Sequence, residues 1–115
     1  MKVLSIVTID RTNGHPHDDP TVPQRMGTLI QEMRTKGALV DTGGRDTDML
    51  ELSIARKNGQ TSVTDGPFAE SKEVVGGFAL MEVKERDDAI AWTKRFLDVL
   101  GTGTCYLHEV SPTPS

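Results

Sequence analysis

The residues of this chain that could take part in chemistry gather in a few short segments. Residues 64–78 read TDGPFAESKEVVGGF and combine a turn with charged and aromatic side chains. Asp65-Gly66-Pro67 is a turn signal, because Asp accepts backbone N–H bonds, Gly permits positive φ and Pro fixes the exit. An ordinary solvated loop is the alternative. The candidate ligand contacts here are Asp65, Phe68, Glu70 and Lys72.

Two aspartates and one histidine are candidates for acid–base chemistry. Asp65 lies in that turn, and Asp41 follows the apolar residues 38–40, where a cleft residue could sit. A carboxylate in apolar surroundings can act as a general base at neutral pH. His108, on an expected strand, could supply a proton carrier. A structural hydrogen bond is the alternative role for each of the three.

Asp41-Thr42-Gly43 also matches the Asp-Thr-Gly of retroviral-type aspartic proteases, in which each subunit of a homodimer contributes one Asp. That fold is nearly all-β, whereas this chain has two helical patterns. An aspartic protease therefore stays as a remote alternative.

The segment 15–19, HPHDD, places two imidazoles and two carboxylates within five residues. Divalent transition metals favour such ligands, which makes His15 and His17 candidates. A loop this charged is usually solvated, and no distant second ligand pair is evident, so we expect no metal site. Gly43-Gly44 and Gly76-Gly77 match no phosphate-binding pattern, so we expect no nucleotide or other cofactor.

The composition limits the partners and the cellular location that we expect for this protein. The chain has 115 residues, with 13 Lys and Arg against 17 Asp and Glu, for a net charge of -4. A general basic surface for nucleic acid is thereby disfavoured. The one cysteine cannot form an intramolecular disulfide. No apolar run approaches the ~18 residues that span a bilayer. We expect a cytoplasmic protein of one domain, residues 1–110, with a flexible tail at 111–115.

Hydrophobic periodicity predicts the elements that must position these residues. Apolar residues recur at helical spacing after residue 21 and after residue 87. Thr21 and Gln24 have the spacing of a capping box. Asn58-Gly59 is a hairpin signal. The expected strands are 3–9, 38–42, 50–55, 60–64, 78–83 and 104–110, and the expected helices run from 21 to 37 and from 87 or 88 to 101.

Without the hairpin, this order is βαββαβ, the ferredoxin-like pattern, which makes the fold class α+β with an inserted β-hairpin. Both helices then cover one face of an antiparallel sheet. The strand 3–9 carries apolar residues on both faces, with Val3, Val7 and Ile9 on one side and Leu4 and Ile6 on the other. Only one of these faces can be covered by the helices. A second copy of the chain is the natural cover, so we expect a homodimer of the dimeric α+β barrel type.

Residues 64–78 closely resemble the DGPF signature of the YCII-related proteins. The resemblance continues through 76–83 and 89–96 and, more weakly, through 36–44 and the opening strand. It implies a ferredoxin-like, usually dimeric α+β protein with a cleft beside the dimer interface. Some relatives are thought to use a His–Asp pair, and a few act on chlorinated aromatic compounds. Others have no assigned reaction or are associated with alternative sigma factors.

The enzyme-like relatives carry their histidine on the first helix, whereas residues 24–36 contain none. We therefore expect binding of a small organic molecule in a cleft near the dimer interface, with carboxylate acid–base chemistry as an open possibility. The alternative is a non-enzymatic accessory module that contacts a regulatory protein, for example in sigma-factor-linked regulation.

Overall fold

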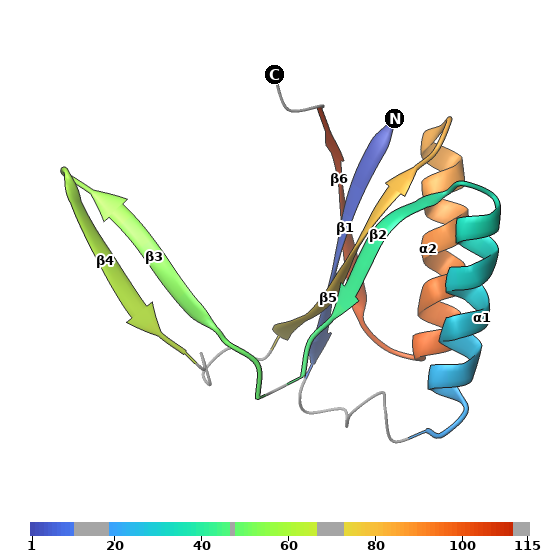
Figure 1. Ribbon diagram of the computed structural model, residues 1–115, viewed down its shortest axis with the longest axis horizontal. Coiled ribbons are helices and arrows are strands. Elements are labelled where there is room, and N and C mark those ends of the chain that lie inside the picture. The colour runs from blue at the N-terminus through green and yellow to red at the C-terminus, as the bar shows by residue number, and fades with distance from the viewer. Residues whose placement is uncertain (11–18, 47, 67–72, 112–115) are drawn as a thin grey trace.

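The computed structural model describes residues 1–10, 19–46, 48–66 and 73–111. Six strands and two helices follow one another along these residues (Figure 1). Their bounds are β1 (Lys2–Asp10), α1 (Val22–Thr35), β2 (Leu39–Gly44), β3 (Leu52–Lys57), β4 (Gln60–Asp65), β5 (Glu73–Glu82), α2 (Arg86–Leu100) and β6 (Thr104–Val110).

The main sheet has the strand order β2-β5-β1-β6, and each neighbouring pair is antiparallel. Both helices lie on one face of it (Figure 1). Without β3 and β4, this is the strand order and layering of a ferredoxin-like βαββαβ unit. The predicted α+β class is therefore confirmed.

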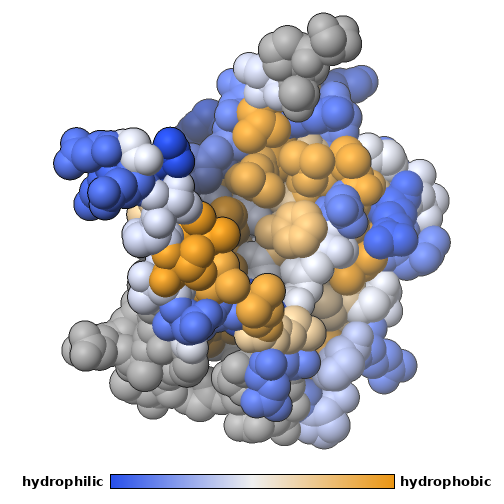
Figure 2. All heavy atoms as spheres, turned by 60° about the vertical axis from the view of Figure 1, so that its left-hand side comes forward, coloured by the Kyte–Doolittle hydropathy of each residue, from blue (hydrophilic) through white to orange (hydrophobic). Residues whose placement is uncertain are grey.

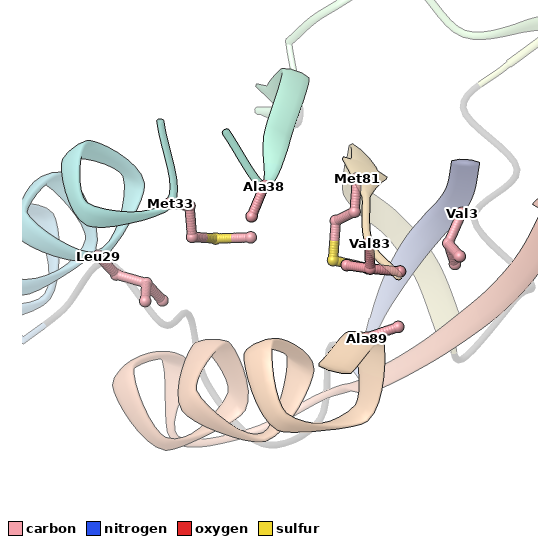
Figure 3. Close-up of a cluster of buried hydrophobic side chains, with 7 residues drawn as sticks. All are labelled: Val3, Leu29, Met33, Ala38, Met81, Val83 and Ala89. Carbon is pink, nitrogen blue, oxygen red and sulfur yellow. The ribbon is translucent and has the colours of Figure 1, made fainter. Parts of the chain in front are cut away.

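The hydrophobic core lies between the helices and the sheet face that they cover, which we call the inner face (Figure 3). Val3 of β1 and Met81 of β5 lie opposite each other in the sheet, so both side chains point to the inner face. Residues two positions further along each strand point to the same face, because side chains alternate between the two sides of a strand. Met81 is only 2% exposed. Helix α1 contributes Leu29 and Met33, which belong to the apolar stripe that the sequence predicts. The remaining members of the cluster are Ala38, Val83 and Ala89.

The helix ends differ in detail from the expectation. Thr21 precedes α1 but makes no side-chain capping bond, and the Thr21–Gln24 capping box does not form. Instead, the backbone N–H and the hydroxyl of Thr21 both donate to Oδ1 of Asp19 at 2.8 Å. Helix α2 begins slightly earlier than expected, since Glu85 is its N-cap and the Asp88 carboxylate accepts the Glu85 N–H at 3.3 Å.

Strand β5 begins at Glu73, five residues before the expected start at Phe78. The prediction was wrong because the turn signal at residues 65–67 favours a loop, which we expected to continue to Val75, with the two glycines just before the strand. A Cβ on Gly77 would lie 2.5 Å from the carbonyl oxygen of Gly43, and one on Gly76 would lie 2.6 Å from Ile9. These glycines therefore permit close approach inside the strand. The β1–β5 register also shifts beside them, between Val7 and Thr8.

A charged cluster links the two helices. Arg95 on α2 forms an ion pair with Glu32 on α1, and Lys36 lies 3.6 Å from the same carboxylate. The Arg95 and Lys36 cations lie 5.1 Å and 5.7 Å from the centre of the Trp92 ring. Cations attract aromatic ring faces, so the cluster ties α1 to α2 above the core.

We expect this link to depend on pH. The pKa of the Glu32 carboxyl lies below its ordinary 4.5, mainly because Arg95 donates a hydrogen bond to the carboxylate. A folded-state pKa below the unfolded value stabilises the fold above pH 4.5, and this stabilisation is lost as the pH falls through the folded-state pKa. Thermal unfolding should show Glu32→Gln slightly less stable than the wild type at pH 7 and equal to it well below pH 4.5. The effect is small because both side chains are exposed.

Glu109→Gln, which alters an exposed carboxylate on β6, is the matched control. A stability difference for Glu32→Gln that stayed constant from pH 7 to strong acid would contradict the assignment.

The other face of the main sheet, which we call the outer face, is also apolar. Leu4 and Ile6 of β1 lie directly opposite Leu80 and Phe78 of β5, and Ile6 also lies opposite Tyr106 of β6. Phe78 is 39% exposed and Tyr106 is 45% exposed. Among the described elements, no helix covers this face (Figure 1).

Strands β3 and β4 form a separate two-stranded antiparallel hairpin that projects away from the outer face (Figure 1). Asn58 and Gly59 have φ values of 52° and 76°, as a type I′ turn requires. Every residue of both strands is exposed.

Candidate functional site

A cavity of about 240 Å³ lies between the inner face of the sheet and the two helices. Helix α1 forms one wall with Met26 and Ile30, and helix α2 forms another with Trp92 and Phe96. The sheet closes the cavity from below. Small-molecule sites in proteins are typically apolar cavities with a few polar groups, and this cavity fits that description.

Two of the polar groups in the lining are threonine hydroxyls. Oγ1 of Thr42 donates to the carbonyl of Phe78 at 2.8 Å, and Oγ1 of Thr93 donates to the carbonyl of Ala89 at 2.8 Å. A hydroxyl carries one hydrogen and two lone pairs. Because both hydrogens are already used, these two oxygens can offer a ligand only acceptor capacity.

Cys105 of β6 and Ser5 of β1 also belong to the polar part of the lining. Burial raises the pKa of the Cys105 thiol, and a hydrogen bond with the Ser5 side chain opposes this to a smaller extent. The thiol is therefore neutral at pH 7 and is a weak nucleophile. It serves the cavity as a small, weakly polar wall.

Arg45 lies at the rim of the cavity, just after β2. Its backbone N–H donates to the carbonyl of Gly76 at 2.9 Å. Its guanidinium donates to the carbonyl of Met49 at 3.4 Å and lies 4.0 Å from the Glu51 carboxylate. Glu51 in turn accepts the N–H of Gly66 through its backbone carbonyl at 2.8 Å. Arg45 therefore connects the cavity rim to the base of the hairpin.

The predicted acid–base residues lie outside this lining. Asp65 is exposed at the end of β4, opposite Leu52. Asp41 is exposed, and its Oδ1 accepts the neighbouring Thr42 N–H at 2.9 Å. His108 is exposed on β6.

Asp41 and His108 do share one cross-strand row of the main sheet. Asp41 pairs with Leu80, Leu80 with Leu4, and Leu4 with His108. Three strand spacings separate the two ends of the row, which is about 14 Å at ~4.8 Å per spacing. Within one protomer, these two residues are too far apart to exchange a proton directly.

Five predicted candidates lie outside the described residues. They are the ligand candidates Phe68, Glu70 and Lys72 and the metal candidates His15 and His17. Within the described ranges, no group of three or more His, Cys, Asp and Glu side chains is placed to hold a metal ion.

Sequence reasoning missed the cavity itself. Trp92 and Cys105 appear in the sequence as ordinary packing residues, and both also line the cavity. Ser5 gave the clearest local signal, because it interrupts the inward-facing series Val3, Ser5, Val7 of β1 with a polar side chain that is only 7% exposed. A buried polar residue in an apolar series indicates a hydrogen-bonded site or a cavity.

Comparison with known proteins identifies the class. The sequence model of the YCII-related domain matches residues 2–99, and the chain belongs to this family. No curated protein matches it. Among solved structures, it is similar to the 5-chloro-2-hydroxyhydroquinone dehydrochlorinase of Burkholderia phenoliruptrix AC1100 in complex with 2,5-dihydroxybenzoquinone. That match has a TM-score of 0.48 and 13% identity and covers 96% of this chain and 94% of that chain.

In the described part of the chain, neither α1 nor α2 has the length and apolar character needed to cross a membrane.

Proposed function

We propose that this protein binds a small, largely apolar organic molecule in the cavity between the sheet and the two helices. The observation that carries this proposal is a partly open apolar cavity of about 240 Å³ in a domain of 115 residues. Ligand sites in proteins are typically concave and mostly apolar, with a few polar groups that orient the ligand. The space between the sheet and the helices has both features.

The volume limits the ligand to a small molecule. An apolar cavity of about 150 Å³ is known to hold one benzene molecule. A cavity of about 240 Å³ therefore has room for a single substituted ring or a short branched chain. The two threonine oxygens, which can only accept, favour a ligand that carries an O–H or N–H donor.

We also infer that two copies of the chain pair through the outer face of the main sheet. The support is its row of partly exposed apolar side chains, which includes Ile6, Phe78 and Tyr106. A large exposed apolar patch is typical of an interface. Acid–base chemistry by Asp41 or His108 would then take place at this interface, where a second copy brings further residues opposite them.

Binding can be tested with benzene, phenol and benzoate, which share one ring and differ in a single group. At least one of them should raise the thermal midpoint of the wild-type protein, because a ligand that binds only the folded state stabilises it. It should also slow alkylation of Cys105 by iodoacetamide, since this thiol lines the cavity.

The variant Ala79→Leu fills the cavity from its floor. Ala79 lies opposite Ser5 and Thr42 in the register of the sheet, and all three line the cavity. We expect this variant to stay folded and to bind the active compound at least tenfold more weakly. Leu80→Met, one residue further on and on the outer face, is the matched control and should bind normally. Equal binding by Ala79→Leu and the wild type would contradict the assignment of the cavity.

A further inference from the structure

The hairpin β3–β4 has two different faces, and neither is covered by the described part of the protomer. Ile54 lies directly opposite Val63, and Leu52 projects from the same face two residues before Ile54. The three are 64%, 61% and 37% exposed. This apolar centre lies between two polar pairs of that face, in which Asp65 is opposite Leu52 at the base and Arg56 is opposite Thr61 toward the turn. The opposite face carries small and polar side chains, namely Ser53, Ala55, Ser62 and Thr64.

Such a hairpin is not expected to hold its shape alone in water. A two-stranded hairpin is marginally stable by itself, and both of its strands are open edges. An apolar face with β-branched residues opposite each other stabilises a sheet when that face is buried. We propose that β3–β4 is an arm whose apolar face packs against a second copy of this chain. This inference rests on the proposed pairing of two copies.

The size of the outer sheet face favours a second copy as the occupant. Four strands spaced ~4.8 Å apart and about 20 Å long cover on the order of 400 Å². Each partner in a stable interface buries ~800 Å² of accessible surface, and even a side-chain surface rougher than its flat footprint leaves the outer face at the small end of this range. Two exchanged arms would add apolar area to the same interface.

The position of the arm supports the same occupant. Apolar side chains gather both on the sheet and on the hairpin in one view of the molecule, on either side of a hollow (Figure 2). The arm and the outer sheet face can therefore contact the same body. In a two-fold symmetric pair, each arm makes the same contact with the other subunit, so the arm contributes twice.

Sedimentation equilibrium on the full chain over a micromolar concentration series tests the arm. Ile54→Lys places a charge on the apolar face, and Ala55→Lys places the same charge on the polar face of the same strand. Both residues are exposed in the protomer, so neither change disturbs its core. We expect Ile54→Lys to raise the dimer dissociation constant at least tenfold and Ala55→Lys to change it less than twofold.

Hydrogen exchange of the β3 and β4 amides gives a second readout. Protection should rise with protein concentration in the wild type and in Ala55→Lys but not in Ile54→Lys. If the Ile54→Lys dimer is as tight as the wild-type dimer, the proposed contact of the arm is wrong, while the pairing through the sheet still stands. Equal weakening by both variants would lead to the same conclusion. A wild-type chain that stays monomeric over the whole concentration series would overturn both the arm contact and the pairing through the sheet. Ligand binding in the cavity is tested independently, by the thermal shifts with benzene, phenol and benzoate.

Discussion

Gly77→Ala should lower the free energy of unfolding by about 3 kcal/mol or more, near the upper end of overpacking changes in a well-packed interior. The added Cβ would lie 2.5 Å from the Gly43 carbonyl oxygen and 3.2 Å from Cα of Gly44. Both are backbone atoms of β2, so no side chain can rotate away to make room. Strand β2 would have to move off β5, which weakens its hydrogen bonds and shifts the rim of the cavity. Urea denaturation followed by circular dichroism measures the change.

Gly27→Ala is the matched control, because it adds the same methyl group at a site with free space. No atom lies within 4 Å of the added Cβ, and Gly27 is exposed in the middle of α1. Alanine is favoured over glycine in a helix by about 0.5–1 kcal/mol, so this variant should be more stable than the wild type. The two substitutions should thus have opposite signs. Equal stability of Gly77→Ala and the wild type would show that β2 and β5 do not approach as closely as described.

Ile6→Lys should convert the proposed dimer into a monomer at micromolar concentration. Ile6 lies in the central strand β1, with Phe78 on one side and Tyr106 on the other. An ammonium group buried there would have no partner of opposite charge in its row. Substitutions at the centre of an interface cost at least about 2 kcal/mol when they remove a main contact, which is roughly thirtyfold in Kd. Sedimentation velocity over a dilution series measures this change.

Thr28→Lys adds the same charge to the exposed surface of α1, away from the sheet, and should leave the association unchanged. The thermal midpoint of Ile6→Lys at low concentration shows whether the protomer is still folded. A folded Ile6→Lys protein that associates as tightly as the wild type would rule out the outer sheet face as the interface.

The order of elements follows from local patterns that survive in the folded chain. The helical spacing of Met26, Leu29, Ile30 and Met33 predicts α1, and Leu29 and Met33 are indeed buried. The start of β5 was missed because nothing in the local sequence after the turn at 65–67 marks where the loop ends. The first residues of β5 are defined instead by their pairing with β1.

The candidate site was much less predictable. Asp41 and Asp65 stand out in the sequence because of the residues beside them, yet neither lines the cavity. The polar lining comes instead from separate elements, with Ser5 on β1, Thr93 on α2 and Cys105 on β6. Nothing in the local sequence around any one of them indicates the other two.

The amino-acid sequence by itself determined the family, the α+β class and the turn at Asn58-Gly59, because periodicity, turn chemistry and motifs act over a few neighbouring residues. The tertiary structure decided where the empty space lies and which side chains surround it. A cavity arises where the combined volume of side chains from several packed layers falls short of the space between them, and that shortfall belongs to no single segment.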